Sequence, residues 1–196
     1  MFIAPAPESD AASRIYRSTL DSQGFVMNLT RAWAWRPDVY EGFAALRNQL
    51  TSQSTMTPRE TAVLVCAAAA ELGDSYCALA WGRTLARAAD ARSAAAVIEG
   101  RSTAEMTARE QALASWARKV ASDPNGTTAD DVSALRSAGL SDREIVEATM
   151  FVAFRLAFST VNDALGLQPD WQLADTAPPE VAAAVTFGRP PASKPA

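Results

Sequence analysis

The pattern of apolar positions along the chain predicts helices throughout. Apolar residues recur three or four positions apart in one segment after another, and no stretch of strand length alternates apolar with polar residues. We therefore expect an all-α fold. The expected helices cover residues 9–22, 38–50, 58–73, 74–100 with a break near Asp90, 108–122, 128–138 and 141–165.

Residues 57–85 are expected to form a helical hairpin around which the rest of the bundle packs. Thr57, Pro58 and Glu60 have the spacing of a capping box with proline at the first helical position. Gly73 can take the left-handed conformation that ends a helix, and Asp74 can cap the next one. Cys77 would then occupy the third position of the second helix, where free backbone N–H groups favour a thiolate.

The opening of the first hairpin helix recurs fifty residues later. Residues 56–62 read MTPRETA and residues 106–112 read MTAREQA, so that Thr107 and Glu110 repeat the capping box of Thr57 and Glu60. The recurrence indicates an internally repeated helical unit and favours a capping role for Glu60.

The helix expected at 141–165 is apolar on most of its sides. Such a helix is typical of the centre of a bundle or of a subunit interface. Trp33 and Trp35, in the apolar segment 25–36, suit the same two environments. We therefore expect a homo-oligomer whose interface, above about 2,000 Å² in total, is built from the last helix and the 25–36 segment.

Composition adds limits to this picture. With 196 residues, 48% hydrophobic and 20% charged, the chain suits one domain spanning 1–196: an N-terminal helical segment 9–55, a core 56–166 and an extended C-terminal tail 167–196. Residues 1–8 are expected to be a poorly packed arm. The net charge of −4 argues against binding to nucleic acid or to anionic membranes. The apolar runs are too short to span a membrane, and the first residues, MFIAPAPESD, lack the features of a signal peptide, so a cytoplasmic location is expected.

The absence of histidine removes several classes of site. Ser-His-Asp and Cys-His nucleophile activation and histidine-ligated zinc all need this residue. We expect no metal site and no cofactor. The two cysteines, Cys66 and Cys77, are not expected to form a disulfide, because Cys66 lies roughly 10 Å along the helix from the hairpin bend.

The hairpin resembles the core of the AhpD-like, or carboxymuconolactone decarboxylase, family. Its redox members carry Glu, eleven further residues and then Cys-x-x-Cys-x-x-x-His across such a hairpin. Aligned on DSYC at 74–77, the family's second, peroxide-reactive cysteine matches Cys77, whereas its first cysteine, glutamate and histidine fall on Asp74, Ala62 and Trp81. The apolar segment before TPRE and the helices that end in FSTVNDALGL extend the resemblance over nearly the whole chain. It implies a helical bundle that assembles as a trimer or hexamer, whereas a dimer is the commonest state of homo-oligomers in general.

Three functional readings follow. The leading one is a peroxidase-related protein with a degenerate redox centre and little or no alkyl hydroperoxide reductase activity, since Asp74 opposes thiolate formation at Cys77 and no proton relay remains. A second is a thiol-independent, decarboxylase-like enzyme with Asp74, or an inward-turned Glu60, as the acid/base group. The third is a non-catalytic structural oligomer, or one that binds a small hydrophobic ligand. Trp81 is expected to fill the former pocket.

Overall fold

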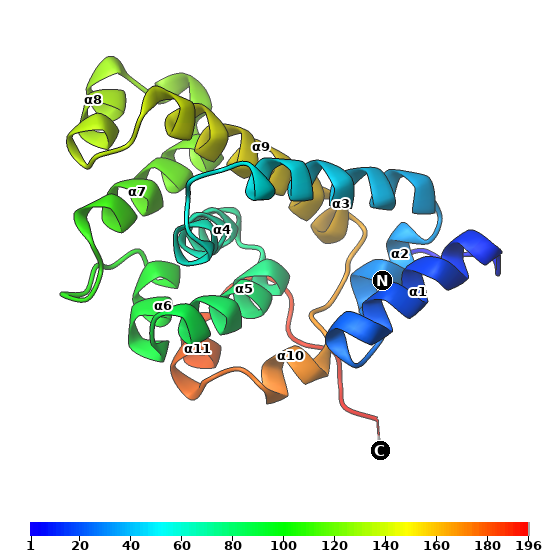
Figure 1. Cartoon of the computed structure of the whole chain (residues 1–196). Helices are drawn as coiled ribbons and strands as arrows, with labels where there is room; N and C mark the ends of the chain where they lie inside the picture. Colours follow the sequence, from blue (N-terminus) through cyan, green and yellow to red (C-terminus); the bar gives the residue numbers. More distant parts are fainter. Residues whose placement is uncertain (196) are drawn as a thin grey trace.

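Residues 1–195 are described by a computed structural model, and within this range the chain is helical without strands (Figure 1). The fold class predicted from the sequence is thus confirmed. The α-helices are α1 (Asp10–Gln23), α2 (Asn28–Trp33), α3 (Pro37–Ser52), α4 (Pro58–Leu72), α5 (Ser75–Ala88), α6 (Ala91–Ile98), α7 (Ala108–Ser122), α8 (Ala129–Ser137), α9 (Asp142–Ala164), α10 (Trp171–Asp175) and α11 (Pro179–Ala184), with a 3₁₀ turn, η1 (Pro124–Gly126).

Helix α4 is the centre of the bundle, with α5, α6, α7 and α9 packed around it (Figure 1). Every residue from 60 to 69 is buried. Its many alanines allow neighbouring helices to approach closely on all sides. Of the two places expected for the last long helix, the centre of the bundle is wrong, because α9 covers one side of α4 and leaves its own outer face exposed. Its place in a subunit interface stays a prediction.

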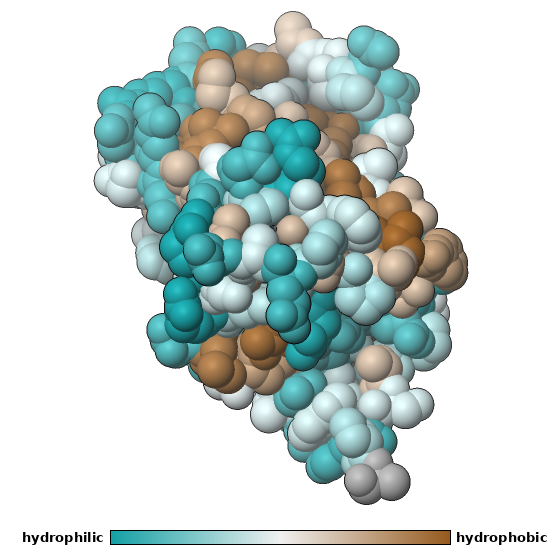
Figure 2. Space-filling model, turned by 90° about the vertical axis from the view of Figure 1, so that its right-hand side faces the viewer, coloured by the Kyte–Doolittle hydropathy of each residue, from teal (hydrophilic) through white to brown (hydrophobic). Residues whose placement is uncertain are grey.

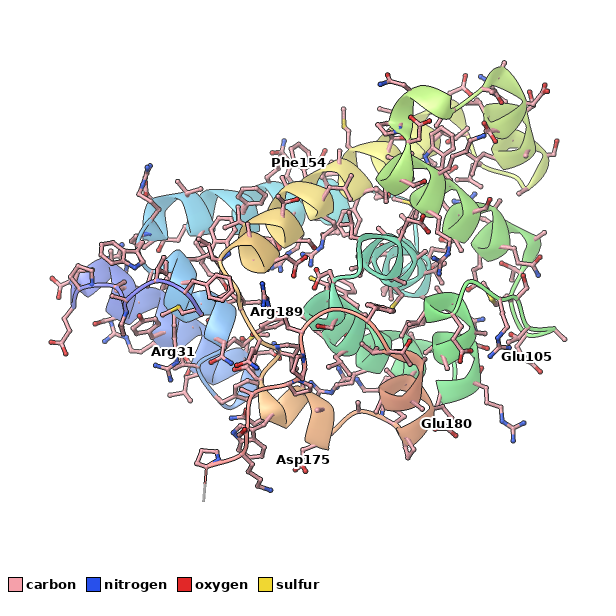
Figure 3. All side chains as sticks on the ribbon, turned by 180° about the vertical axis from the view of Figure 1, so that it is seen from behind. Arg31, Glu105, Phe154, Asp175, Glu180 and Arg189 are labelled. Atoms are coloured by element: carbon pink, nitrogen blue, oxygen red, sulfur yellow. The ribbon has the colours of Figure 1, made fainter. Side chains whose placement is uncertain are left out.

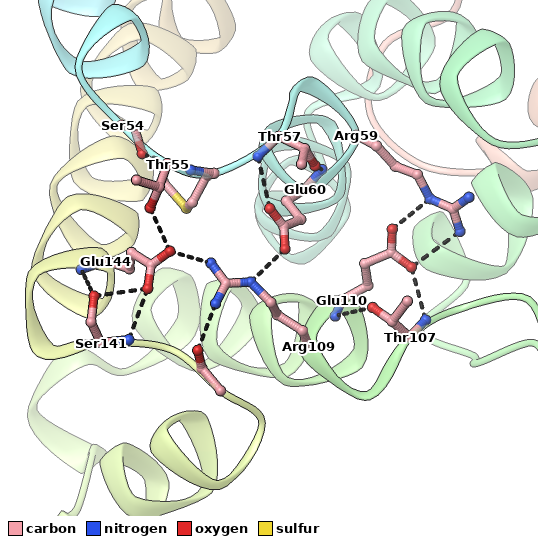
Figure 4. Close-up of polar contacts among 12 residues, drawn as sticks. Ser54, Thr55, Thr57, Arg59, Glu60, Thr107, Arg109, Glu110, Ser141 and Glu144 are labelled. Carbon is pink, nitrogen blue, oxygen red and sulfur yellow. Dashed lines mark hydrogen bonds and ion pairs between the residues drawn. The ribbon is translucent and has the colours of Figure 1, made fainter.

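The two repeated helix starts meet and exchange ion pairs (Figure 4). Both expected capping boxes are present, at Thr57 and at Thr107. Arg59 of the first copy pairs with Glu110 of the second at 2.5 Å, and Arg109 of the second pairs with Glu60 of the first at 2.5 Å. Arg109 also contacts Glu144, the capping residue of α9, at 2.5 Å. The repeat therefore joins the beginnings of α4, α7 and α9.

The N-terminal helices form a second, smaller core against α5 and α9. Trp33 stacks on Phe158 with ring centroids 4.9 Å apart and donates from Nε1 to Asn162 Oδ1 at 2.8 Å. Trp35, by contrast, is 48% exposed. The arm at 1–8 is tied down more than expected, since Phe2 N donates to the Leu165 carbonyl at 2.9 Å.

The C-terminal segment, expected to be extended, contains the short helices α10 and α11 and then returns to the hairpin. Figure 3 shows Arg189 in the chain that passes beside α5. Ser75 Oγ donates to the Arg189 carbonyl at 2.7 Å. A Cβ at Gly188, whose φ is +71°, would lie 2.4 Å from the Gly73 carbonyl oxygen, so this approach needs glycine.

The surface on the side of α1 and α3 is largely hydrophilic, with hydrophobic residues in separate patches (Figure 2). Among residues 1–195, none of the helices combines the length and apolar character that crossing a membrane requires.

Candidate functional site

The turn between α4 and α5 places Cys77 as the sequence predicts. Gly73 ends α4 with φ +72°, and Asp74 Oδ1 accepts from the Cys77 backbone N–H at 2.9 Å. Cys77 is the third residue of α5. Asp74 is fully buried, and its Oδ2 has no hydrogen-bond partner among the described residues.

The thiol of Cys77 faces two side chains of α9. Arg155 Nη2 donates to Cys77 Sγ at 2.8 Å, and Ser159 Oγ lies 3.6 Å from the sulfur. Burial, followed by the charge of Asp74, raises the pKa of Cys77 to about 12, although Arg155 acts in the opposite direction. Because this pKa lies far above neutral, Cys77 is a protonated thiol at pH 7.

A pocket of about 380 Å³ opens beside this thiol, between α1, α3, α5 and α9. Cys77, Trp81 and Arg155 line it together with Tyr40, Tyr76 and Phe158. Trp81 forms part of the wall and does not fill the space, so the prediction of a plugged pocket is wrong. The guanidinium carbon of Arg155 lies over the Trp81 indole, 5.7 Å from the ring centroid.

Tyr76 is held in the wall by Asp170, which is distant in the sequence. Its hydroxyl donates to Asp170 Oδ2 and accepts from Leu29 N at 3.3 Å, while Asp170 Oδ1 accepts from Asn28 N at 2.9 Å. Burial raises the pKa of both Tyr76 and Asp170. This buried group ties α5 to the start of α2 and fixes one side of the pocket.

The remaining residues predicted for the site lie elsewhere. Ala62 and Glu60 belong to α4 and are absent from the pocket lining; Glu60 is bound by Arg109 and by the Thr57 backbone. Cys66 and Cys77 are both free thiols, and Cys66 is buried outside the pocket. Sequence reasoning missed Arg155, which comes from a helix 78 residues away along the chain.

A second polar group lies near the hairpin turn, where Asp163 of α9 is close enough to Asp74 to be affected by its charge. Burial, then the charge of Asp74, raises the pKa of Asp163 to about 7, and Arg189 acts in the opposite direction. Neither carboxylate lines the Cys77 pocket. Nowhere in residues 1–195 do three or more Asp, Glu or Cys side chains gather as a metal site would require.

At the level of sequence, no protein-family model and no curated protein matches the chain. Several solved structures, however, are similar to it in fold. An AhpD core, peroxidase-related protein from Ralstonia eutropha JMP134 is 24% identical with a TM-score of 0.73, over 87% of this chain and 93% of that one. A peroxidase-related protein from Silicibacter sp. TM1040 is 20% identical with a TM-score of 0.75, over 88% and 91%.

A third similar structure contains a bound small molecule. It is a cysteine-to-alanine variant of the debrominase Bmp8 in complex with 2,3,4-tribromopyrrole, 15% identical with a TM-score of 0.72, over 94% of this chain and 96% of that one. These likenesses show that the chain has the AhpD-like fold predicted from its hairpin.

Proposed function

We propose that this AhpD-like chain has lost the two-thiol peroxide cycle and uses the pocket at Cys77 to bind a small, flat organic molecule. The observation that carries the proposal is one thiol, bonded by Arg155, in the wall of a pocket of about 380 Å³ lined by aromatic rings. Polar side chains of α1 also line this pocket, and pockets of this size that combine ring surfaces with placed polar groups are typical ligand sites.

The chemistry around the thiol disfavours a peroxidase. The thiolate is the reactive form, and the pKa of about 12 keeps Cys77 protonated at neutral pH. Ala62, Asp74 and Trp81 stand where the resembling family has its glutamate, first cysteine and histidine. The other thiol, Cys66, lies outside the pocket and so is badly placed to resolve an oxidised Cys77.

The case for a flat ligand rests on the pocket wall. Tyr40, Tyr76, Trp81 and Phe158 supply ring surfaces, and planar molecules bind rings through their faces and edges. That a debrominase of the same fold binds a brominated pyrrole supports the idea that this fold can hold small heteroaromatic molecules.

The purified protein is expected to consume cumene hydroperoxide, in the presence of excess dithiothreitol, no faster than its Cys77→Ser variant. The reason is the protonated thiol, because the thiolate is the form that attacks a peroxide; dithiothreitol itself would reduce an oxidised Cys77. The hydroperoxide is followed by a coupled colour assay, with a Cys66→Ser variant as the control for the second thiol. Turnover that disappears only in Cys77→Ser would show that the redox centre is intact.

A second candidate function is favoured by the two carboxylates near the turn. The free Oδ2 of Asp74 and the pKa of about 7 at Asp163 are properties of acid/base groups. A thiol-independent, decarboxylase-like enzyme would convert a lactone or acid substrate in Cys77→Ser but not in Asp74→Asn. Glu60 does not serve this role, because Arg109 and the Thr57 backbone occupy its carboxylate.

We also propose that the chain assembles through the outer face of α9. Val146, Met150, Ala153, Ala157, Thr160 and Ala164 are all exposed and recur at alternating spacings of four and three residues. Phe154 and Val161 are each 37% exposed beside this row, and Figure 3 shows Phe154 on the outer side of α9. The row has the spacing of a helix-pairing seam about 27 Å long.

The occupant that suits this face is a second copy of the chain. The row contains no charge, so two copies related by a two-fold axis would not repel each other there, and its alanines allow close approach. Leu29 and Trp33 of the 25–36 segment are buried within the chain itself, which moves the proposed interface onto α9 alone.

Ala157→Glu is expected to dissociate the assembly, because it places two like charges at the middle of the seam. Light scattering coupled to size-exclusion chromatography should give a dimer or larger for the wild type and a monomer for the variant. Ser133→Glu, which adds the same charge on the exposed side of α8, serves as the control. A monomeric wild type at micromolar concentration would refute the assembly.

A further inference from the structure

We infer that the ligand of the Cys77 pocket is an anion, a flat aromatic acid whose carboxylate binds Arg155. The inference rests on the proposed ligand pocket and adds the chemical class of its occupant. It comes from the hydrogen-bonding state of one arginine and from the charges around it.

Arg155 has donors that the described residues leave unused. A guanidinium carries five N–H groups, and the hydrogen bonds of Arg155 comprise one, from Nη2 to Cys77 Sγ. Its Nε is buried and has no acceptor. Such a group is costly to bury without a partner. Nη1 also has no acceptor among the described residues but is not fully buried, so a carboxylate that enters the pocket can accept from the terminal N–H groups.

No carboxylate of residues 1–195 lies within 4.0 Å of the Arg155 guanidinium. The ion pairs of α9 lie nearer its beginning, at Arg143 and Glu144. The Arg155 guanidinium instead lies over two rings, 5.0 Å from the centroid of Phe158 and 5.7 Å from that of Trp81. Rings orient the guanidinium plane, and the terminal N–H groups at its edge are where a carboxylate binds.

The charge of the pocket as a whole agrees with this orientation. Two arginines, Arg155 and Arg47, line it, and no Asp or Glu does. This contrasts with the net charge of −4 on the whole chain. A pocket with positive walls inside an acidic protein selects anions over cations and neutral molecules.

A different role for Arg155 would be to stabilise a Cys77 thiolate. An arginine with that role would hold the thiol pKa low, whereas burial and Asp74 outweigh it and the pKa stands near 12. One hydrogen bond to a neutral sulfur satisfies little of the hydrogen-bonding capacity of a guanidinium. The guanidinium therefore remains available to an acid that enters from the pocket.

A matched ligand pair tests the charge of the occupant. We expect isothermal titration calorimetry to show 2-naphthoate binding at least tenfold more tightly than 2-naphthamide, which has the same ring system without the charge. Arg155→Met should bring the two affinities together, and Arg155→Lys should restore part of the preference for the acid. Arg143→Met, at an exposed arginine of the same helix, should leave the preference unchanged.

The outcomes separate the two claims. If neither compound binds the wild type, both the pocket proposal and the anion inference fail. If both bind equally well, or if Arg155→Met keeps the preference for the acid, the pocket stands and the anion inference is overturned. Should Arg155→Met fail to fold, the acid-to-amide ratio of the wild type and of Arg155→Lys still decides the question.

Discussion

Arg109→Met is expected to lower the free energy of unfolding by about 2–3 kcal/mol, because it leaves two largely buried carboxylates without their cation. Arg109 bridges Glu60 and Glu144, each at 2.5 Å, and donates from Nη1 to the Gly139 carbonyl at 2.8 Å. The side chains of the two glutamates are 9% and 12% exposed. Urea denaturation at pH 7 measures the change.

The same variant should also alter the dependence of stability on pH. The Arg109 hydrogen bond, followed by that of Thr55, lowers the pKa of Glu144 to about 2 from an ordinary value of 4.5. A lowered folded-state pKa gives stability that is complete above the unfolded-state pKa and is lost as pH falls towards the folded-state value. The wild type should therefore lose stability between about pH 4.5 and pH 2, and Arg109→Met should lose much less over that range.

Arg136→Met is the matched control, since its ion pair with Asp142 is exposed and should contribute little to stability. An Arg109→Met protein that is as stable as the wild type, or that loses as much stability at acid pH, would show that the repeated helix starts do not hold the bundle together.

Asp74→Asn is expected to speed alkylation of Cys77 by iodoacetamide about tenfold at pH 8, which corresponds to one pKa unit. The charge of Asp74 raises the pKa of the thiol, and asparagine removes that charge while remaining a good helix cap. Arg155→Met should act in the opposite direction and slow the reaction, because Arg155 lowers the same pKa.

The alkylation rate is measured by intact-protein mass spectrometry between pH 7 and pH 10 in a Cys66→Ala background, so that Cys77 is the thiol that reacts. Asp142→Asn, which removes an exposed carboxylate at the start of α9, is the control. Equal rates in the wild type and in Asp74→Asn would mean that access to the pocket, and not the electrostatics of the turn, limits the thiol.

Local signals predicted the helices and the hairpin well. The capping boxes at Thr57 and Thr107, the left-handed Gly73 and the Asp74 cap each act within four residues, so the sequence contains the whole interaction. Long-range arrangement was harder to read. The apolar α9 suited either the centre of the bundle or a subunit interface, and α4 lies at the centre because its small residues allow it to be surrounded.

The sequence predicted only part of the site, because the rest depends on contacts between distant segments. Cys77, Asp74 and Trp81 lie within eight residues, and their order along one helix predicts their closeness. Arg155 meets Cys77 only because α9 packs across the hairpin, and nothing near position 155 marks it. The helical turns at 171–175 and 179–184 were hidden by the prolines around them.

A crystal structure of the protein grown with 2-naphthoate tests the central claim most directly. We expect density for the ligand between Trp81 and Arg155, with a carboxylate oxygen within about 3.2 Å of an Arg155 nitrogen and Cys77 still a free thiol. An empty pocket at saturating ligand, or density only elsewhere on the surface, would contradict the assignment of this cavity as the functional site.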